Sequence, residues 1–215
     1  MTAASQSEFE VTAAFPTLIG RCQRTGVEAI NERLARQILD RERSSPSHDH
    51  ANFGGWHSAA DLLDWQGDEI VALRNWITGS LQQIVRASLL LPESQGRQVA
   101  PRGSFAVSAW ANVSRRGNYH RLHNHPGSVW SGCYYVTGQP DDQTGSLAGV
   151  LEFYDPRPFT EMVDCPGSPY GQRILIRPTP GLLIFFPSWL YHFVHPCDSD
   201  DPRISIAFNA SWRPS

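Results

Sequence analysis

The centre of the chain reads His120-Arg-Leu-His-Asn-His-Pro-Gly-Ser128. Three of the eight histidines of this 215-residue protein lie in this stretch, which otherwise has the character of a β-strand. A second pair, His192 and His195, follows about seventy residues later, at the end of an apolar run. Imidazoles gathered at two distant points of one β-rich chain predict that folding brings them together around a metal ion.

The alternation of side chains along a strand narrows the choice of ligands. Residues two apart point to the same face of a strand, and residues one or three apart point to opposite faces. His123 and His125 can therefore both point into a barrel, whereas His120 is expected to point away if the strand stays extended. For the same reason His192 and His195 cannot both face inward. The alternative is that each histidine is separately a surface residue or a satisfied core residue.

The C-terminal half of the sequence has the texture of a β-barrel or sandwich. Short β-branched and aromatic runs alternate there with Gly, Pro and Asp breaks, which is typical of short strands joined by turns. Eight strands are predicted: Ser104–Val113, Tyr119–His125, Val129–Thr137, Gly149–Tyr154, Arg173–Arg177, Gly181–Phe186, Leu190–His195 and Arg203–Trp212.

The N-terminal half predicts helices instead. Apolar residues recur at spacings of three and four over Val27–Arg41 and Asp68–Leu91, which indicates two amphipathic helices. An edge strand at Val11–Leu18 and a short helical turn at Asp61–Trp65 are also predicted. We expect one mainly β, α+β domain over residues 1–215. In it, residues 1–100 form a helical and loop layer, and residues 101–215 form a cupin-like jelly roll, the double-stranded β-helix.

The segment Ser44–Ser58 is a loop on composition, with His48, His50 and His57 inside it. It is either a polar surface loop or a flexible lid from which Asn52, Trp56 or His57 contacts the substrate.

The composition excludes several classes of protein. The chain is 40% hydrophobic and 18% charged, with a formal net charge of −3, so it offers no basic stripe for nucleic acid. No apolar run approaches the roughly 20 residues that span a bilayer. The polar N-terminus lacks the layout of a signal peptide, and the four cysteines show no CxxC motif. We therefore expect a cytoplasmic protein with reduced thiols and without a nucleic-acid or membrane partner.

A buried arginine is predicted beside the histidines. The turn-rich segment Pro196–Pro202 suggests an antiparallel hairpin that places His192 opposite Ser205 and Val194 opposite Arg203. His192, Arg203 and Ser205 would then share one face. A buried guanidinium needs an anion, and a carboxylate held by two hydrogen bonds meets that need. The alternative is a surface pair between Arg203 and a nearby loop aspartate.

These residues resemble the iron(II)- and 2-oxoglutarate-dependent oxygenases, whose fold is the double-stranded β-helix. The family pattern is His-x-Asp/Glu, a distal His, and then Arg-x-Ser/Thr; here it reads His123-Asn-His125, His192 and Arg203-Ile-Ser205. More closely, the chain is similar to a mostly uncharacterised oxygenase subfamily. The matching pieces are Trp110–Val113, Leu122–Val136, Gly181–His192 and Arg203–Asn209, with a weaker echo at Asn52–Trp56.

The resemblance implies which residues hold which groups. Fe(II) is expected on His123, His125 and His192, with His125 replacing the usual carboxylate ligand. The distal carboxylate of the co-substrate 2-oxoglutarate is expected on Arg203 and Ser205. Tyr134 and Asn112 are further candidates for binding the co-substrate. Candidates for the surroundings of the metal or for the substrate pocket are His120, Trp110, Tyr135, Asn209 and Trp56, with Cys133 near the metal. The simpler interpretation is that some of these aromatic side chains pack in the hydrophobic core and do not line the pocket.

The predicted activity is therefore oxidation of an unknown substrate by O2, with release of succinate and CO2. One alternative is a cupin-like dioxygenase that uses three histidines and no 2-oxoglutarate, and in which Arg203 binds the substrate's own carboxylate. Another is a non-catalytic, metal-containing module that binds a small molecule. Jelly rolls often pair through a sheet edge, so a homodimer is a further expectation.

Overall fold

A computed structural model of the chain describes residues 14–48, 50–91, 102–138, 145–162 and 171–215. Within this part of the chain, no helix is long and apolar enough to cross a membrane. The described cysteines, Cys22, Cys133 and Cys197, are free.

Two long helices come first in the chain, as predicted. They are α1 (Glu28–Ser44) and α2 (Asp68–Leu89), with the short 3-10 helix η1 (Leu62–Asp64) between them. In α2 the buried side chains recur at helical spacing, from Ile70 and Leu73 to Ile77 and Leu81, so one stripe of the helix faces the core. Acidic residues in the first turn and arginine in the last suit the helix dipole of both helices.

The strands form two facing antiparallel sheets. Eight of them confirm the predicted strands: β4 (Gly103–Ser114), β5 (Tyr119–His123), β6 (Trp130–Tyr135), β7 (Leu151–Phe153), β8 (Ile174–Ile176), β9 (Leu182–Pro187), β10 (His192–Val194) and β11 (Arg203–Pro214). Three more lie nearer the N-terminus: β1 (Gly20–Gln23), β2 (Asn52–Phe53) and β3 (Trp56–His57). A second 3-10 helix, η3 (Thr160–Met162), follows β7.

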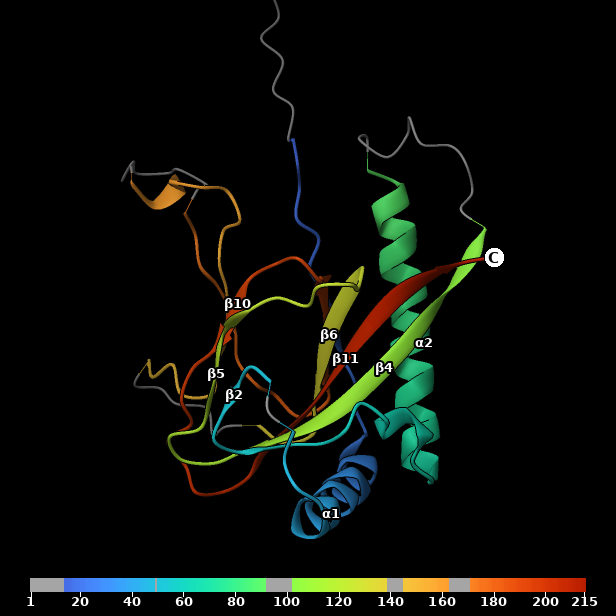
Figure 1. Ribbon diagram of the computed structural model, residues 1–215, viewed down its shortest axis with the longest axis vertical. Coiled ribbons are helices and arrows are strands. Elements are labelled where there is room, and N and C mark those ends of the chain that lie inside the picture. The colour runs from blue at the N-terminus through green and yellow to red at the C-terminus, as the bar shows by residue number, and fades with distance from the viewer. Residues whose placement is uncertain (1–13, 49, 92–101, 139–144, 163–170) are drawn as a thin grey trace, which may run out of the picture.

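The sheet topology is that of a double-stranded β-helix. The larger sheet has the order β1-β9-β6-β11-β4-β3, and the smaller has the order β2-β5-β10-β7-β8. Figure 1 shows β4 and β11 as the longest strands, with α2 on one side of them and β2, β5 and β10 on the other. The predicted α+β architecture, with helices backing a jelly roll, is confirmed.

The larger sheet separates a hydrophobic core from the interior of the barrel. One face packs against both helices, through buried residues such as Leu34, Leu73, Ile206 and Phe208. The other face looks toward the smaller sheet, where a second apolar cluster forms around Phe153 and Phe186. Each strand of the larger sheet therefore sends alternate side chains to the helices and to the barrel interior.

Two local predictions are wrong. The segment Pro196–Pro202 does not close a hairpin, because β10 pairs with β5 and β7 whereas β11 pairs with β4 and β6. The segment instead carries the chain from one sheet to the other. The predicted edge strand at Val11–Leu18 lies partly outside the described residues, and its described part, 14–18, is not a strand. The edge strand is β1, which pairs with β9.

Candidate metal centre and pocket

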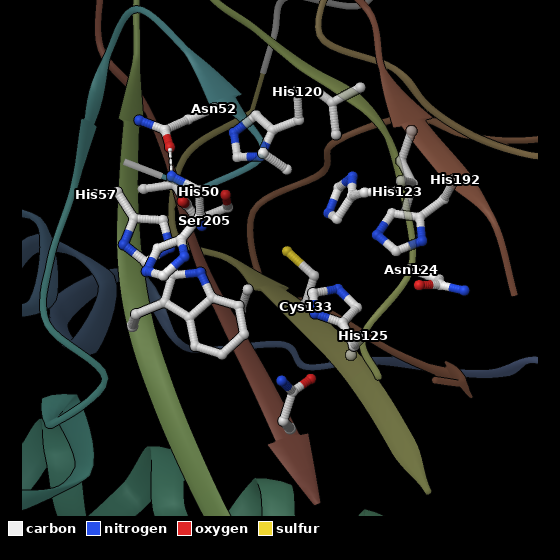
Figure 2. A pocket seen from close by; sticks show the side chains of 18 of the residues that line it. His50, Asn52, His57, His120, His123, Asn124, His125, Cys133, His192 and Ser205 are labelled. Carbon is white, nitrogen blue, oxygen red and sulfur yellow. Dashed lines mark hydrogen bonds between the residues drawn. The ribbon is translucent and has the colours of Figure 1, made fainter. Parts of the chain in front are cut away.

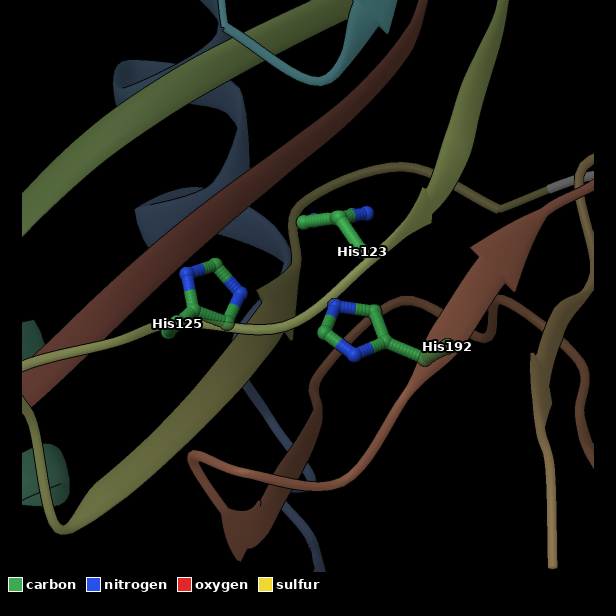
Figure 3. A group of neighbouring side chains, drawn as sticks. All are labelled: His123, His125 and His192. Carbon is green, nitrogen blue, oxygen red and sulfur yellow. The ribbon is translucent and has the colours of Figure 1, made fainter. Parts of the chain in front are cut away.

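Three histidines converge from two strands and the loop between sheets (Figure 3). His123 ends β5 and His192 begins β10, and the two are direct partners in the ladder. His125 follows two residues after β5, where its backbone N–H donates to the Ser188 carbonyl at 2.8 Å. One ring nitrogen from each histidine lies within 4.8 Å of the others. Among the described residues, these three histidines form the group of potential ligands that could hold a metal ion.

Backbone carbonyls orient two of the three rings. Nδ1 of His123 lies 2.6 Å from the Arg121 oxygen, and Nδ1 of His192 lies 2.9 Å from the Leu190 oxygen. Because a carbonyl only accepts, Nδ1 carries the proton in both rings and the Nε2 lone pair is free. This arrangement, with one nitrogen on a carbonyl and the other on the ion, is typical of metal-binding histidines.

Burial keeps the triad in the form that binds metals. Removal from water lowers the pKa of His125 to about 4, and it lowers the pKa values of His123 and His192 as well. Mutual repulsion among the three rings adds to the decrease for His125 and His192. The imidazoles are therefore neutral at pH 7, which is the state that coordinates.

The donor set fits a first-row transition metal. Imidazole nitrogen suits iron, nickel, copper and zinc rather than magnesium or calcium. Three nitrogens at about 2.1 Å from one ion lie at most about 4 Å apart. Small side-chain rotations would bring the nitrogens from the observed separation of up to 4.8 Å to this distance. A three-nitrogen set also leaves coordination positions for other ligands.

A β-bulge corrects the prediction for His120. In the ladder His192 pairs with His123 and Val194 pairs with His120, so three steps along β5 match two steps along β10. The additional residue lets His120 and His123 face the same side, although parity in a regular strand separates them. His120 therefore lies in the pocket (Figure 2). Burial and the neighbouring Arg203 charge lower its pKa to about 3.

Arg203 is buried without an acidic partner. Its side chain is at the start of β11, and the residue is 2% exposed. One terminal N–H donates to the Ser205 hydroxyl at 3.4 Å, the guanidinium carbon lies 5.3 Å from the centre of the Tyr135 ring, and Nε has no partner. Among the described residues, no carboxylate lies within ion-pair distance of Arg203, and the predicted alternative of a surface pair is wrong. A buried unpaired cation is costly, so this position suits an anionic ligand.

The histidines and Arg203 line one cavity of about 530 Å³ between the sheets. This volume is in the range of small-molecule sites. The predicted pocket residues Trp110, Asn112, Tyr135 and Asn209 line it, and so does Cys133. Phe186, Leu151 and Val194 supply an apolar wall beside the metal ligands.

Two predicted pocket residues lie elsewhere. Tyr134 faces the helices, where its hydroxyl donates to the Asn31 side chain at 2.7 Å and its ring contacts Trp76. Its neighbour Tyr135 takes the pocket face, as alternation along β6 requires. Trp56 is buried in the helix-side core and donates to the Ser45 carbonyl at 3.0 Å.

The histidine-rich loop contributes to the pocket through short strands. β3 pairs with the end of β4, which places His57 beside Asn112. β2 pairs with β5, which places Asn52 beside His120. His50, Asn52 and His57 therefore line the cavity (Figure 2). Strands of two residues leave too short a pattern to recognise in a sequence, and the clustered histidines are the signal that pointed to this loop.

Comparison with known proteins agrees with this geometry. Residues 108–209 match the family described as "Putative 2OG-Fe(II) oxygenase". No match was found among curated proteins.

Similar solved structures include two prolyl hydroxylases and the protein HygX. A Pseudomonas putida prolyl-4-hydroxylase has a TM-score of 0.62 at 14% identity, over 91% of this chain and 92% of the other. A Trichoplax adhaerens prolyl hydroxylase, in complex with a peptide fragment of hypoxia inducible factor, has a TM-score of 0.59 at 13% identity, over 90% and 83%. HygX from Streptomyces hygroscopicus, with nickel and 2-oxoglutarate bound, has a TM-score of 0.57 at 12% identity, over 91% and 83%.

At these identities the structural likeness establishes the fold, and the family match covers the segment that holds the histidine triad and Arg203. The segment 108–209 therefore resembles the putative 2OG-Fe(II) oxygenases, and the chain has the double-stranded β-helix fold of the solved structures.

Proposed function

We propose that this protein is an Fe(II)- and 2-oxoglutarate-dependent oxygenase that oxidises an unidentified prime substrate, consuming O2 and releasing succinate and CO2. The observation that carries the proposal is Arg203, a buried guanidinium that has no acidic partner among the described residues and that lines the same cavity as the histidine triad. A metal and a dicarboxylate beside it would use both features. The similarity to HygX, which was solved with nickel and 2-oxoglutarate, supports the same pair of ligands.

The proposed roles follow from position. His123, His125 and His192 would hold iron, and Arg203 with Ser205 would hold the distal carboxylate of 2-oxoglutarate. When bound, iron and 2-oxoglutarate together supply the oxidising chemistry that activates O2. The carbonyls of Arg121 and Leu190 keep two imidazoles in the coordinating tautomer.

Other pocket residues would control access and orientation. The Tyr135 ring covers one side of the Arg203 guanidinium and is fully buried, which excludes water from the carboxylate site. Burial raises the pKa of the Cys133 thiol to about 11, so the thiol is protonated in the metal-free protein. Cys133 also lies outside the group of described side chains that could hold the ion. Phe186 and Leu151 keep the metal side of the cavity apolar.

The third histidine gives this site its distinctive charge. Most members of the wider family place a carboxylate where His125 stands, so the three neutral imidazoles leave the full charge of a divalent ion uncompensated by protein. We expect the dianionic co-substrate to be attracted more strongly as a result.

An anaerobic titration tests the proposal. Iron(II) is added to the protein, followed by 2-oxoglutarate, and the weak visible charge-transfer band of the chelate is recorded. We expect the band in the wild type and in His120→Ala, and its loss in His125→Ala and His192→Ala. Iron binding without a 2-oxoglutarate band would favour the cupin-like alternative. Loss of iron in His120→Ala alone would refute the ligand assignment.

A further inference from the structure

The wall of the pocket on the β3–β4 side carries polar groups that the proposed chemistry does not use. His57 and Asn112 are ladder partners, and Trp110 lies two residues before Asn112 on the same face of β4. Arg203 leans toward Tyr135 on β6. Because the strand order is β6-β11-β4-β3, Trp110, Asn112 and His57 lie on the β4 side of β11 and Tyr135 lies on its β6 side. Ser205, on β11, is the ladder partner of both Asn112 and Tyr135.

Asn112 has an unsatisfied hydrogen-bonding group at this wall. The residue is 3% exposed, and its side-chain oxygen has no hydrogen-bond partner among the described residues. Buried amides are nearly always hydrogen-bonded, and an unmade bond destabilises the folded state. Since Asn112 lines the cavity, a ligand there can supply the missing partner.

His57 presents a second acceptor at the same wall. Its Nδ1 lies 2.6 Å from the Ser58 carbonyl, so Nδ1 carries the proton and Nε2 accepts. Nε2 has no partner among the described residues. The ring lies 5.5 Å from Trp110 with 18° between their planes. It also packs against His50, which Figure 2 shows beside it, and these two contacts hold it in place. Burial lowers the pKa of His57 to about 4, so the ring is a neutral acceptor at pH 7.

The charges around the cavity limit what this wall can bind. The described lining includes Arg121 and Arg203 but no aspartate or glutamate. An ammonium group would find no counter-ion there, and it would meet two cations. A carboxylate would be repelled by the hydrogen-bond acceptor atoms of His57 and Asn112. An uncharged group that donates hydrogen bonds needs no counter-ion and can bond to both acceptors.

We propose that Asn112, His57 and Trp110 form the subsite for the prime substrate, and that this subsite selects an uncharged carboxamide over an ammonium or a carboxylate. The Asn112 amide can pair with a carboxamide through two hydrogen bonds, while Nε2 of His57 accepts its second N–H. Trp110 offers an aromatic surface to a planar group. The inference rests on the proposed function in one respect, because Arg203 and the triad are assigned there to 2-oxoglutarate and the metal.

Three probes of one shape test the selection. Benzamide, benzoate and benzylamine share a ring and differ in the charge of the head group. Each is titrated into the full chain loaded with Zn(II), which is diamagnetic and also suits imidazole ligands, and with saturating 2-oxoglutarate, which keeps benzoate away from Arg203. Binding is followed by saturation-transfer NMR and by the Trp110 indole resonance, assigned with Trp110→Phe. We expect benzamide to bind at least about tenfold more tightly than the other two. Equal or tighter binding of benzylamine or benzoate, or no saturable binding of benzamide, would overturn the proposal.

Matched variants locate the subsite. Asn112→Leu keeps the approximate size and removes the amide, and His57→Phe keeps an aromatic ring and removes Nε2. Both are expected to weaken benzamide binding by about tenfold. Asn75→Leu, the same substitution on an exposed position of α2, is expected to leave the affinity unchanged. Unchanged affinity in both pocket variants would contradict the assignment. If either variant fails to fold, the ranking of the three probes on the wild type remains decisive.

Failure of the subsite and failure of the proposed function have different signatures. The benzamide titration is repeated without metal and without 2-oxoglutarate. Benzamide binding that depends on Asn112, in a protein that forms no 2-oxoglutarate chelate, would leave the subsite standing and remove the proposed oxygenase activity. A normal chelate band without benzamide binding would support the proposed oxygenase activity and contradict the subsite.

Discussion

At the scale of single residues, Arg203 has the clearest consequence. Its guanidinium is buried, with Ser205 and Tyr135 as its neighbours and no acid beside it. Many buried arginines are paired within the protein, and for such a residue the partner explains the burial. Here the described part of the chain provides no such partner, so the folded protein carries a charge that a ligand must compensate.

Arg203→Leu should therefore weaken 2-oxoglutarate binding by about 2–5 kcal/mol, because the distal carboxylate loses its charged partner in a site shielded from water. Isothermal titration into the Ni(II)-loaded protein measures this change. Arg116→Leu is the matched control, since Arg116 pairs with Asp200 on the exposed surface and its loss should leave the affinity unchanged. An Arg203 variant that binds 2-oxoglutarate normally would refute the role of this residue.

The roles of the individual histidines were only partly accessible from the sequence. His-x-His spacing and strand parity selected His123, His125 and His192, and the structure brings these three together. Parity failed for His120, because it assumes a regular strand and β5 contains a bulge. A bulge changes the hydrogen-bond register without a characteristic residue type, so spacing in the sequence does not reveal it.

At the scale of elements, a side-chain contact between β7 and the residue after β10 supports their pairing on the face of the smaller sheet that points away from the pocket. Glu152 on β7 is 1% exposed, and one carboxylate oxygen lies 2.6 Å from Nε2 of His195, just after β10. The other oxygen lies 3.3 Å from Nε of Arg173, without the alignment of a hydrogen bond. Glu152 follows the pocket-lining Leu151, and His195 follows the pocket-lining Val194, so their contact lies on the opposite face of the smaller sheet.

Glu152→Gln is expected to lower the free energy of unfolding by about 1–3 kcal/mol, because it replaces a charge-assisted bond and leaves buried polar atoms less well satisfied. Urea denaturation measures the change. Asp200→Asn, which removes an exposed ion pair, should cost at most about 1 kcal/mol. Equal effects of the two substitutions would show that the buried contact contributes nothing beyond a surface pair.

The regular elements were largely predictable from the sequence, and their connections were not. The eight C-terminal strands and the two helices follow from hydrophobic periodicity and turn residues. The two-residue strands β2 and β3 are too short to have a periodicity, so the way in which His50 and His57 enter the pocket was not predictable. The segment from Pro196 to Pro202 has the composition of a hairpin, yet it joins strands in different sheets. Turn composition indicates where a strand ends, but not which strand pairs with it.

At the scale of the whole molecule, the proposed ligands connect the two sheets. His123 and His192 belong to the smaller sheet, and Arg203 and Ser205 belong to the larger. The larger sheet is already held by the helices through an extensive apolar core, whereas in the described part of the chain the smaller sheet packs on the smaller cluster around Phe153 and Phe186. Metal and co-substrate should therefore stabilise the association of the sheets.

The melting temperature should therefore rise in two steps as the metal and then the co-substrate are added. A ligand at a hundred times its dissociation constant stabilises the folded state by about 2.7 kcal/mol, which corresponds to roughly 5–10 °C for a chain of this size. Ni(II) should raise the melting temperature of the wild type, and 2-oxoglutarate should raise it again. In Arg203→Leu the first step should remain and the second should be strongly reduced. A second step of full size in that variant would contradict the proposed contact.

The bulge in β5 makes the length of this strand more important than much of its sequence. The side chain of Leu122, between the two inward histidines, is exposed, so many substitutions there should be tolerated, whereas Arg121 contributes its charge to the cavity lining. Insertion of a single residue between His120 and His123 would enlarge the bulge and turn one of the two histidines away, whereas removal of one residue would restore a regular strand in which both face inward. A deep mutational scan of this segment should therefore tolerate exchanged codons at position 122 and the loss of one codon, but almost never an added codon.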